Sequence, residues 1–226
     1  FTRIYQSERG AENGYAPQSL SHLKNVLLYL LSRCGEVFYT KMNKILFYAD
    51  FLSYRRRGMA ITGLCYKAIE YGPVPERWDR VYSHFDEIIQ EPRAYGEKEG
   101  TVLISVAEPD KGALSDAEMD ILNEVCDKFS SSTSSGITEI SHKEQAWLNH
   151  VTGHQRIPYT DAYTLNAIWY YQNLPLSLPL LLQGVLREDD SEGGDGYAYP
   201  LVGGEEFAAY EPGDQGWCYR DEGGED

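Results

Sequence analysis

The sequence has 226 residues, of which 42% are hydrophobic, so it is long enough to bury one sizeable core. No apolar run reaches the roughly 18 to 20 residues that span a bilayer. The formal net charge of −15 argues against a general nucleic-acid binder, which is usually basic. None of the four cysteines lies in a C-x-x-C pair, so we expect reduced thiols in a cytoplasmic protein.

The negative charge is concentrated near the C-terminal end. Residues 187–226 hold 13 acidic and 2 basic side chains, whereas the rest of the chain has a net charge of only −4. This stretch also contains six aromatic residues between positions 197 and 219. Its composition favours a disordered, solubilising tail. The alternative is that carboxylates and rings together imitate a nucleic acid and occupy the basic site of a partner.

Polar residues 1–19 form a predicted linker, and two helices follow it. Apolar residues recur at three- and four-residue steps over 20–34, where Gly35 ends the first helix. Thr40 is the predicted N-cap of the second helix, over 41–57, and Gly58 its C-terminal stop.

The stretch KAIEYGPVPERWDRVY, residues 67–82, predicts a strand, a stiff corner and a helix in close succession. The strand over 64–71 ends at Gly72, which can turn tightly because it lacks a Cβ. Pro73 and Pro75 fix φ, and Pro75 suits the first turn of a helix that carries an apolar stripe as far as Ile89. The corner serves either to dock the strand onto the helix or as a rigid recognition surface.

Further along the chain, a strand over 101–107 is expected to pair with residues 93–97. A capping box at Ser115–Glu118 begins a helix that runs to about Phe129. The serine-rich segment 130–136 reads as a flexible linker. A second S-x-x-E box at Ser141 then predicts another helix, and residues 157–171 a closing one. The fold class is therefore mainly α with a small β-element (α+β), with a domain over 20–173 and a connector and tail over 174–226.

No catalytic, metal or cofactor constellation emerges from the residue pattern, so we expect neither an enzyme nor a cofactor. His150 and His154 have helical metal-ligand spacing, but they lack a third ligand and read as surface histidines. Ser141, His142 and Glu144 resemble parts of a hydrolase triad, yet the capping box explains them more simply. Arg55–Arg57 read either as a solvated helix end or as a site for an acidic group.

Three stretches carry a resemblance to a known family: KMNKILFYADFLSY (41–54), ITGLCYKAIEYGPVPERWDRVY (61–82) and SHKEQAW (141–147). In order and spacing they resemble the Panacea, or SocA-like, antitoxin domain. The first family motif is matched by Lys41, Lys44, Leu46, Phe47 and Tyr48, and the second by Tyr71, Gly72, Pro73 and Val74. The resemblance covers roughly residues 20–170 and is greatest to the subgroup in which a helix-turn-helix module precedes the domain.

The resemblance implies a non-enzymatic antitoxin of a type II toxin-antitoxin system, which neutralises a cognate protein toxin by direct binding. A transcriptional regulator or proteolytic adaptor with another protein partner is the alternative. Contact with nucleic acid is expected only through a leading module missing from this sequence, and no membrane contact is expected. The predicted partner-binding residues are the exposed arginines and the corner: Arg55, Arg56, Arg57, Tyr71, Pro73, Arg77 and Trp78.

Overall fold

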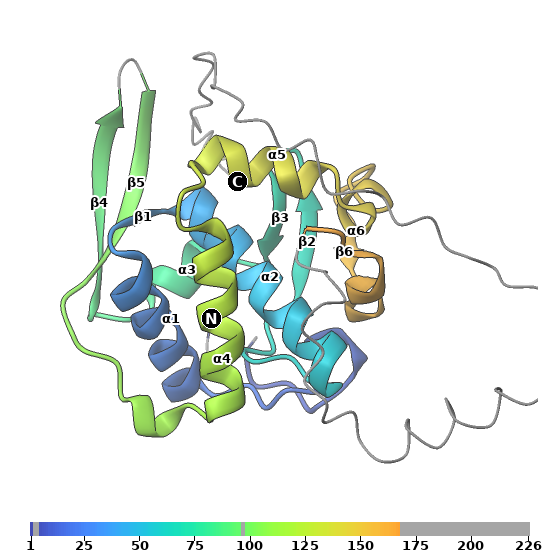
Figure 1. Cartoon of the computed structure of the whole chain (residues 1–226), viewed down its shortest axis with the longest axis horizontal. Coiled ribbons are helices and arrows are strands. Elements are labelled where there is room, and N and C mark those ends of the chain that lie inside the picture. The colour runs from blue at the N-terminus through green and yellow to red at the C-terminus, as the bar shows by residue number, and fades with distance from the viewer. Residues whose placement is uncertain (2–4, 96–97, 168–226) are drawn as a thin grey trace, which may run out of the picture. The chain divides into compact units, whose positions relative to one another are not determined.

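The computed structural model describes residues 1, 5–95 and 98–167, and Figure 1 shows how their elements are arranged. The α-helices in this part of the chain are α1 (Leu20–Cys34), α2 (Tyr39–Arg57), α3 (Trp78–Ser83), α4 (Asp116–Phe129), α5 (Ser134–His142) and α6 (Gln145–Leu148). Short 3-10 helices are η1 (Ala11–Asn13), η2 (Lys111–Ala113) and η3 (Tyr159–Thr164). None of these helices has the combination of length and apolar character that crossing a bilayer requires.

Two small antiparallel sheets accompany the helices. The first has the strand order β1 (Val37–Phe38), β5 (Lys98–Ser105), β4 (Ile88–Tyr95). The second has the order β3 (Gly72–Pro75), β2 (Tyr66–Ile69), β6 (Arg156–Ile157). The predicted α+β class is thus confirmed for the part of the chain that the structure describes.

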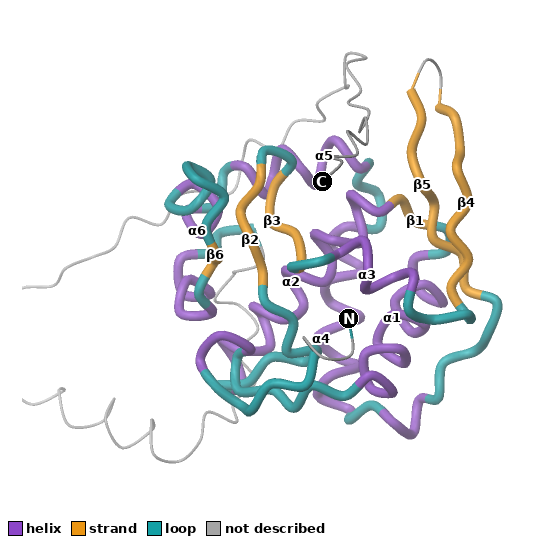
Figure 2. Tube along the Cα trace, turned by 180° about the vertical axis from the view of Figure 1, so that it is seen from behind, coloured by secondary structure: helices purple, strands orange, loops and turns teal. Residues whose placement is uncertain are grey.

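Helix α2 forms the centre of the core. Every side chain from Met42 to Ser53 is buried, as expected for a helix that is enclosed on all sides. It packs against α4 and α5 on one side and against β3 and η3 on others (Figures 1 and 2). The sequence predicted a single inner stripe, but burial also includes the polar Asn43, Lys44 and Asp50.

The β4–β5 hairpin projects beyond α1 (Figures 1 and 2). Its register runs from Ile88↔Ser105 to Tyr95↔Lys98, so both strands are longer than the pairing predicted from the sequence. The predicted helix through Ile89 is wrong, because α3 ends at Ser83. The amide of Val106 donates to the carbonyl of Glu87, so the chain is already paired with β5 where the helix was expected to continue.

Several predicted helix starts also differ. Thr40 does not cap α2, which begins at Tyr39. The serine-rich segment is not simply a linker, since the side chain of Thr133 accepts from the amide of Gly136 and caps α5. Ser141 lies inside α5 and donates to the carbonyl of Thr138, so it caps no helix. The Ser115–Glu118 capping box is confirmed, with both reciprocal hydrogen bonds present.

The predicted closing helix over 157–171 is wrong in its first part. The structure has β6 and then η3 between Arg156 and Thr164. Pairing of Tyr66 with Ile157 recruits this segment to the edge of β2, and a strand there is incompatible with a helix. The remainder of that predicted helix, the boundary near residue 173 and the acidic tail all lie outside the described residues.

The carboxylate of Asp50 on α2 organises the connector that leads to β2. It is fully buried and accepts hydrogen bonds from the amides of Ile61 and Thr62 at 2.9 and 2.7 Å. The hydroxyls of Thr62 and Tyr66 donate to its other oxygen. Burial raises the pKa of Asp50, while these hydrogen bonds oppose the shift. The connector therefore begins its path to the second sheet at a fixed point on α2.

Asp50→Ala should lower the free energy of unfolding by at least about 3 kcal/mol, because it leaves several buried donors without an acceptor. Urea denaturation followed by circular dichroism measures this loss. The control is Asp86→Ala at an exposed position, which should change stability by less than about 0.5 kcal/mol. Equal effects of the two substitutions would contradict a structural role for the buried carboxylate.

Candidate functional site

The Gly-Pro-Val-Pro stretch is itself a strand rather than a corner. Ile69 pairs with Gly72, which leaves Glu70 and Tyr71 as a two-residue hairpin turn between β2 and β3. Because β3 is the edge strand of its sheet, the amide hydrogens missing from Pro73 and Pro75 cost the ladder little. All four residues of β3 are buried. Pro75 is the last residue of this strand, so the prediction that it lies in the first turn of a helix is wrong.

Gly72 allows this hairpin to lie directly on α2 and α5. Its φ is +97°, a region that side chains other than glycine rarely adopt. A Cβ built at this position would lie 2.7 Å from Cε of Lys44 and 2.7 Å from Oγ of Ser141. Three elements therefore meet at one point where there is no room for a methyl group.

The ammonium group at this point lacks a hydrogen-bond partner. Lys44 is fully buried, and its Nζ contacts no acceptor among the described residues. Burial lowers the pKa of Lys44 from 10.5 to about 7. The Nε2 of neighbouring His142 is also buried and has no hydrogen-bond partner in the described part of the chain. Burial, and to a smaller extent the charge of Lys44, lowers the pKa of His142. Near pH 7 the imidazole of His142 is therefore mainly neutral, whereas Lys44 is close to the midpoint of its titration.

The hairpin is also held from the side of α6. The indole Nε1 of Trp147 donates to the carbonyl of Ile69 at 2.8 Å. The same ring stacks on His142, with centroids 4.1 Å apart and an interplanar angle of 14°. The turn at Glu70 and Tyr71 is therefore fixed next to an aromatic pair.

Glu144 connects this region to the end of the described chain. Only 1% of it is exposed, and its carboxylate accepts from the hydroxyl of Tyr48 at 3.2 Å. The amides of Asn166 and Ala167 also donate to it, at 2.7 and 2.9 Å. Burial raises its pKa. Tyr48 and Glu144 come from two different sequence motifs, so these motifs are in direct contact.

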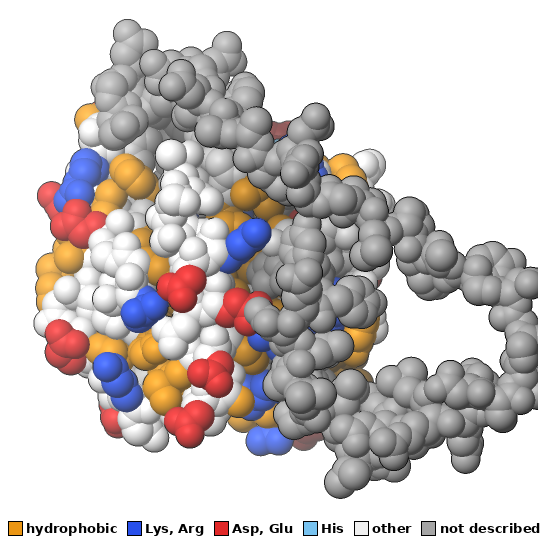
Figure 3. Space-filling model, in the orientation of Figure 1, with side chains coloured by type: hydrophobic (Ala, Val, Ile, Leu, Met, Phe, Trp, Pro, Cys, Tyr) orange, Lys and Arg blue, Asp and Glu red, His pale blue; other side chains and the backbone are white. Residues whose placement is uncertain are grey.

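The predicted arginine cluster mainly fastens α2 to α4. Arg56 makes a two-pronged ion pair with Glu124, at 2.6 and 2.9 Å, and Arg57 lies 3.8 Å from Glu118. Arg55 is half-buried. On the face shown in Figure 3, acidic and basic side chains are interspersed rather than gathered by sign. Pairing with α4 accounts for two of the three arginines without a partner protein.

The remaining predicted binding residues lie at opposite ends of β3. Tyr71, in the turn, is half-buried, and Pro73 is buried, so Pro73 shapes the hairpin rather than presenting a surface. At the other end Arg77 is exposed and has a φ of +56°. The ring of Trp78 meets that of Tyr39 edge-on, with centroids 5.1 Å apart. The structure therefore does not unite the seven predicted residues into one surface.

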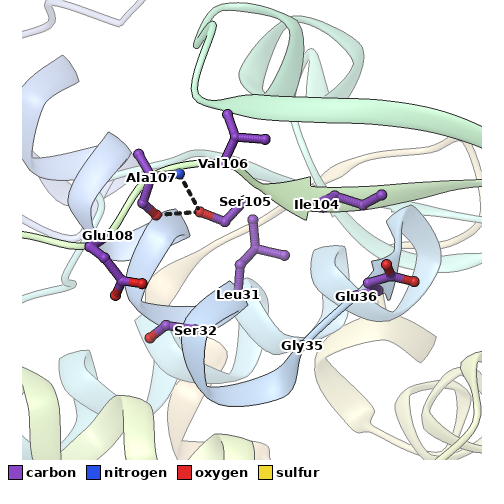
Figure 4. A pocket seen from close by; sticks show the side chains of 9 residues that line it. All are labelled: Leu31, Ser32, Gly35, Glu36, Ile104, Ser105, Val106, Ala107 and Glu108. Carbon is purple, nitrogen blue, oxygen red and sulfur yellow. Dashed lines mark hydrogen bonds between the residues drawn. The ribbon is translucent and has the colours of Figure 1, made fainter.

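A hollow of about 420 Å³ lies between the end of α1 and the end of β5 (Figure 4). The side chain of Leu31 is buried on the α1 side, while Ile104 and Val106 line the β5 side. Val106 is 58% exposed, and Ile89, which pairs with Ile104 in the sheet, is 47% exposed. This apolar surface was not predicted, although the alternating apolar residues Val102, Ile104 and Val106 were a signal for it.

The histidines give no metal site in the described part of the chain. Nε2 of His150 lies 2.8 Å from the carboxylate of Asp161, whereas His154 is exposed. No group of three or more potential ligands occurs among the residues that the structure describes. Ser141 donates to a helix carbonyl and not to His142, so these two side chains do not form a nucleophile and base pair.

The residues that meet around Gly72 lie within a stretch that matches a known family. Residues 42–148 match the family model of the SocA-like antitoxin, Panacea domain. Over this stretch, which is just under half of the chain, the protein resembles the Panacea domain. No curated protein and no solved structure matches the chain. The three stretches that carried the resemblance meet around Gly72, so in this Panacea-like domain they fix the hairpin between α2, α5 and α6.

Gly72→Ala should destabilise the protein by at least about 3 kcal/mol, since the new methyl group meets both backbone strain and two close neighbours. Gly58→Ala is the matched control, because Gly58 also has a positive φ, +70°, but its added Cβ would have open space. It should cost only about 1 kcal/mol. Chemical denaturation of both variants separates strain from crowding, and equal losses would contradict the close approach.

Lys44→Met should stabilise the domain, most strongly below pH 7. There the lysine is protonated in both states, and its buried charge destabilises the folded one. Between about 7 and 10.5 the unfolded state binds more protons than the folded state, so the stability of the wild type rises with pH. The advantage of the variant, on the order of a few kcal/mol at low pH, should therefore shrink as the pH rises.

The measurement is urea denaturation between about pH 6 and about pH 9. Lys111→Met, at an exposed lysine, is the control and should show no pH-dependent difference from the wild type. A constant difference between Lys44→Met and the wild type across this range would show that the amine is not desolvated.

Proposed function

We propose that this chain is an antitoxin that neutralises a cognate protein toxin by direct binding, in a type II system of the cytoplasm. The match of residues 42–148 to the SocA-like Panacea domain is the observation that carries the proposal. The residues of the family motifs support a scaffold role, because their side chains are largely occupied in packing and in hydrogen bonds. The partner is then bound by side chains that this scaffold leaves outside.

Arg77 is the strongest candidate for such a contact. A non-glycine residue with φ near +56° carries backbone strain, which proteins tend to retain where it serves a function. Its side chain is exposed and has no ion pair with another described residue. Beside it, half-buried Trp78 packs edge-on against Tyr39, so a cation lies next to an aromatic pair. Arginine and tryptophan are frequent anchors in protein interfaces.

The other predicted contacts have smaller parts in this proposal. Tyr71 stands in the hairpin turn and can form a second contact, since its position is fixed by Gly72 and Trp147. Arg55 can contribute from the end of α2. Arg56 and Arg57 would first have to leave Glu124 and Glu118, which makes them less available.

Co-expression with the toxin encoded beside this protein tests the function. We expect the chain to restore growth and to co-purify with the toxin in a fixed ratio. Restored growth of the cells without a stable antitoxin–toxin complex would favour an indirect mechanism, such as a proteolytic adaptor. That result would overturn direct binding. Failure to restore growth with any neighbouring gene product would overturn the antitoxin assignment itself.

Arg77→Gly tests the surface separately from the fold. Glycine tolerates a positive φ, so stability should be unchanged or rise by up to about 1 kcal/mol. Affinity for the toxin, measured by titration calorimetry, should fall at least about tenfold. Lys111→Gly removes another exposed cation and should leave affinity unchanged. Unaltered toxin binding by Arg77→Gly would place the interface elsewhere, without affecting the assignment of function.

A further inference from the structure

Two cysteines far apart in the sequence come together between α1 and α4. Cys34 is the last residue of α1, and Cys126 lies in the last turns of α4. Their sulfur atoms are 3.0 Å apart, and both thiols are free. A disulfide requires about 2.05 Å, so the sulfurs need to approach by only about 1 Å.

The neighbouring contacts already hold the two helices in register. The hydroxyl of Tyr29 donates to Oδ1 of Asn123 at 2.9 Å. One residue before Cys34, Arg33 makes an ion pair with Asp127, the residue after Cys126, at 3.0 Å. Because these contacts flank the cysteines on both helices, bridging the sulfurs demands little rearrangement.

The two thiols differ in a way that suits a stepwise oxidation. Cys34 is half-exposed, and its hydrogen bond with Cys126 lowers its pKa, with the charges of Lys41 and Arg33 adding to the effect. Cys126 is 3% exposed, and its hydrogen bond with Cys34 and its burial raise its pKa. A thiolate that solvent can reach, next to a resolving cysteine, is the usual arrangement in redox-sensitive pairs.

We propose that Cys34 and Cys126 form a peroxide-sensitive pair that closes to a disulfide between α1 and α4. The thiolate of Cys34 attacks hydrogen peroxide, so that an S–O bond forms and the O–O bond breaks. Cys34 becomes a sulfenic acid, and the hydroxide released takes up a proton to give water.

Cys126 completes the reaction. Its sulfur attacks the sulfenic sulfur of Cys34, an S–S bond forms, and the S–O bond breaks. The departing hydroxide takes the proton of the Cys126 thiol and leaves as a second water. In total two thiols are oxidised and one peroxide is reduced to two waters, and a thiol reductant restores the starting state.

The bridge would act on the surface of the domain as well as on its stability. Gly35, which follows Cys34 in the chain, lines the apolar hollow with Leu31 and Ser32 (Figure 4). A disulfide would fix the last turn of α1 to α4 and so restrict the wall of that hollow. Cys65 offers a contrast, because burial raises its pKa to about 11 and it has no thiol neighbour among the described residues.

The test is to treat the full chain with hydrogen peroxide, alkylate the remaining thiols, and map the peptides by mass spectrometry. We expect two of the four thiols to disappear. A peptide pair joined through Cys34 and Cys126 should appear and should vanish on reduction. The disulfide should also raise the melting temperature of the intact protein. Peptides in which both residues stay alkylated, or in which Cys34 is overoxidised without a bridge, would overturn the proposal.

Single variants assign the two roles. Cys126→Ser should stop at a sulfenic acid on Cys34, which dimedone traps, whereas Cys34→Ser should give no oxidation at Cys126. Cys65→Ser and Cys218→Ser are the matched controls and should form the bridge as the wild type does. Loss of the Cys34–Cys126 bridge in either control would show that another cysteine takes part, and would overturn this pairing.

Discussion

The close approach of the β2–β3 hairpin to α2 is the contact on which the rest of the domain depends. It is possible only because residue 72 has no side chain and adopts a positive φ, while Lys44 and Ser141 fill the space a Cβ would need. In the same region β6 pairs with β2, and the carboxylate of Glu144 accepts hydrogen bonds from the amides of Asn166 and Ala167. A single backbone position thus allows the β2–β3 hairpin to pack directly against α2 and α5.

The buried centre of the domain contains several polar side chains. Asp50 is satisfied by four donors, and Asn43 accepts from the hydroxyl of Tyr82 at 2.7 Å. Lys44 has no such partner among the residues that the structure describes. Satisfied polar groups in a core favour one arrangement over its alternatives, because any shift leaves them unpaired. The unpartnered amine, by contrast, reduces stability and makes it depend on pH.

These features separate scaffold from surface in this Panacea-like domain. The motif residues Lys44, Gly72 and Glu144 are buried, so they cannot by themselves choose a partner. Arg77, Trp78 and the apolar surface around Val106 are outside that network. In a domain built in this way, substitution of the exposed residues would leave the internal contacts unchanged.

The sequence by itself determined the features that depend on local chemistry. The Ser115–Glu118 box, the ends of α1 and α2 at Gly35 and Gly58, and the small β-element in a mainly helical chain all follow from residues near one another. The family motif could also be recognised from the sequence, because it is defined by residue types and their spacing along the chain. Tertiary structure decided the rest. Ile88 and Ile89 fit a helical stripe as well as a strand, and only pairing with β5 resolves the choice.

Packing between distant segments also decided which residues of the candidate site are exposed. From the sequence, Pro73 and Pro75 were predicted to form a corner, whereas in the structure they pair with β2 as part of a strand. Arg56 was predicted to be available to a partner, whereas Glu124 on α4 lies 2.6 Å from it. The meeting of Cys34 with Cys126 had no local signal at all, since 91 residues separate them in the sequence. Contacts between distant segments depend on how whole elements pack, and neither periodicity nor spacing along the chain records that packing.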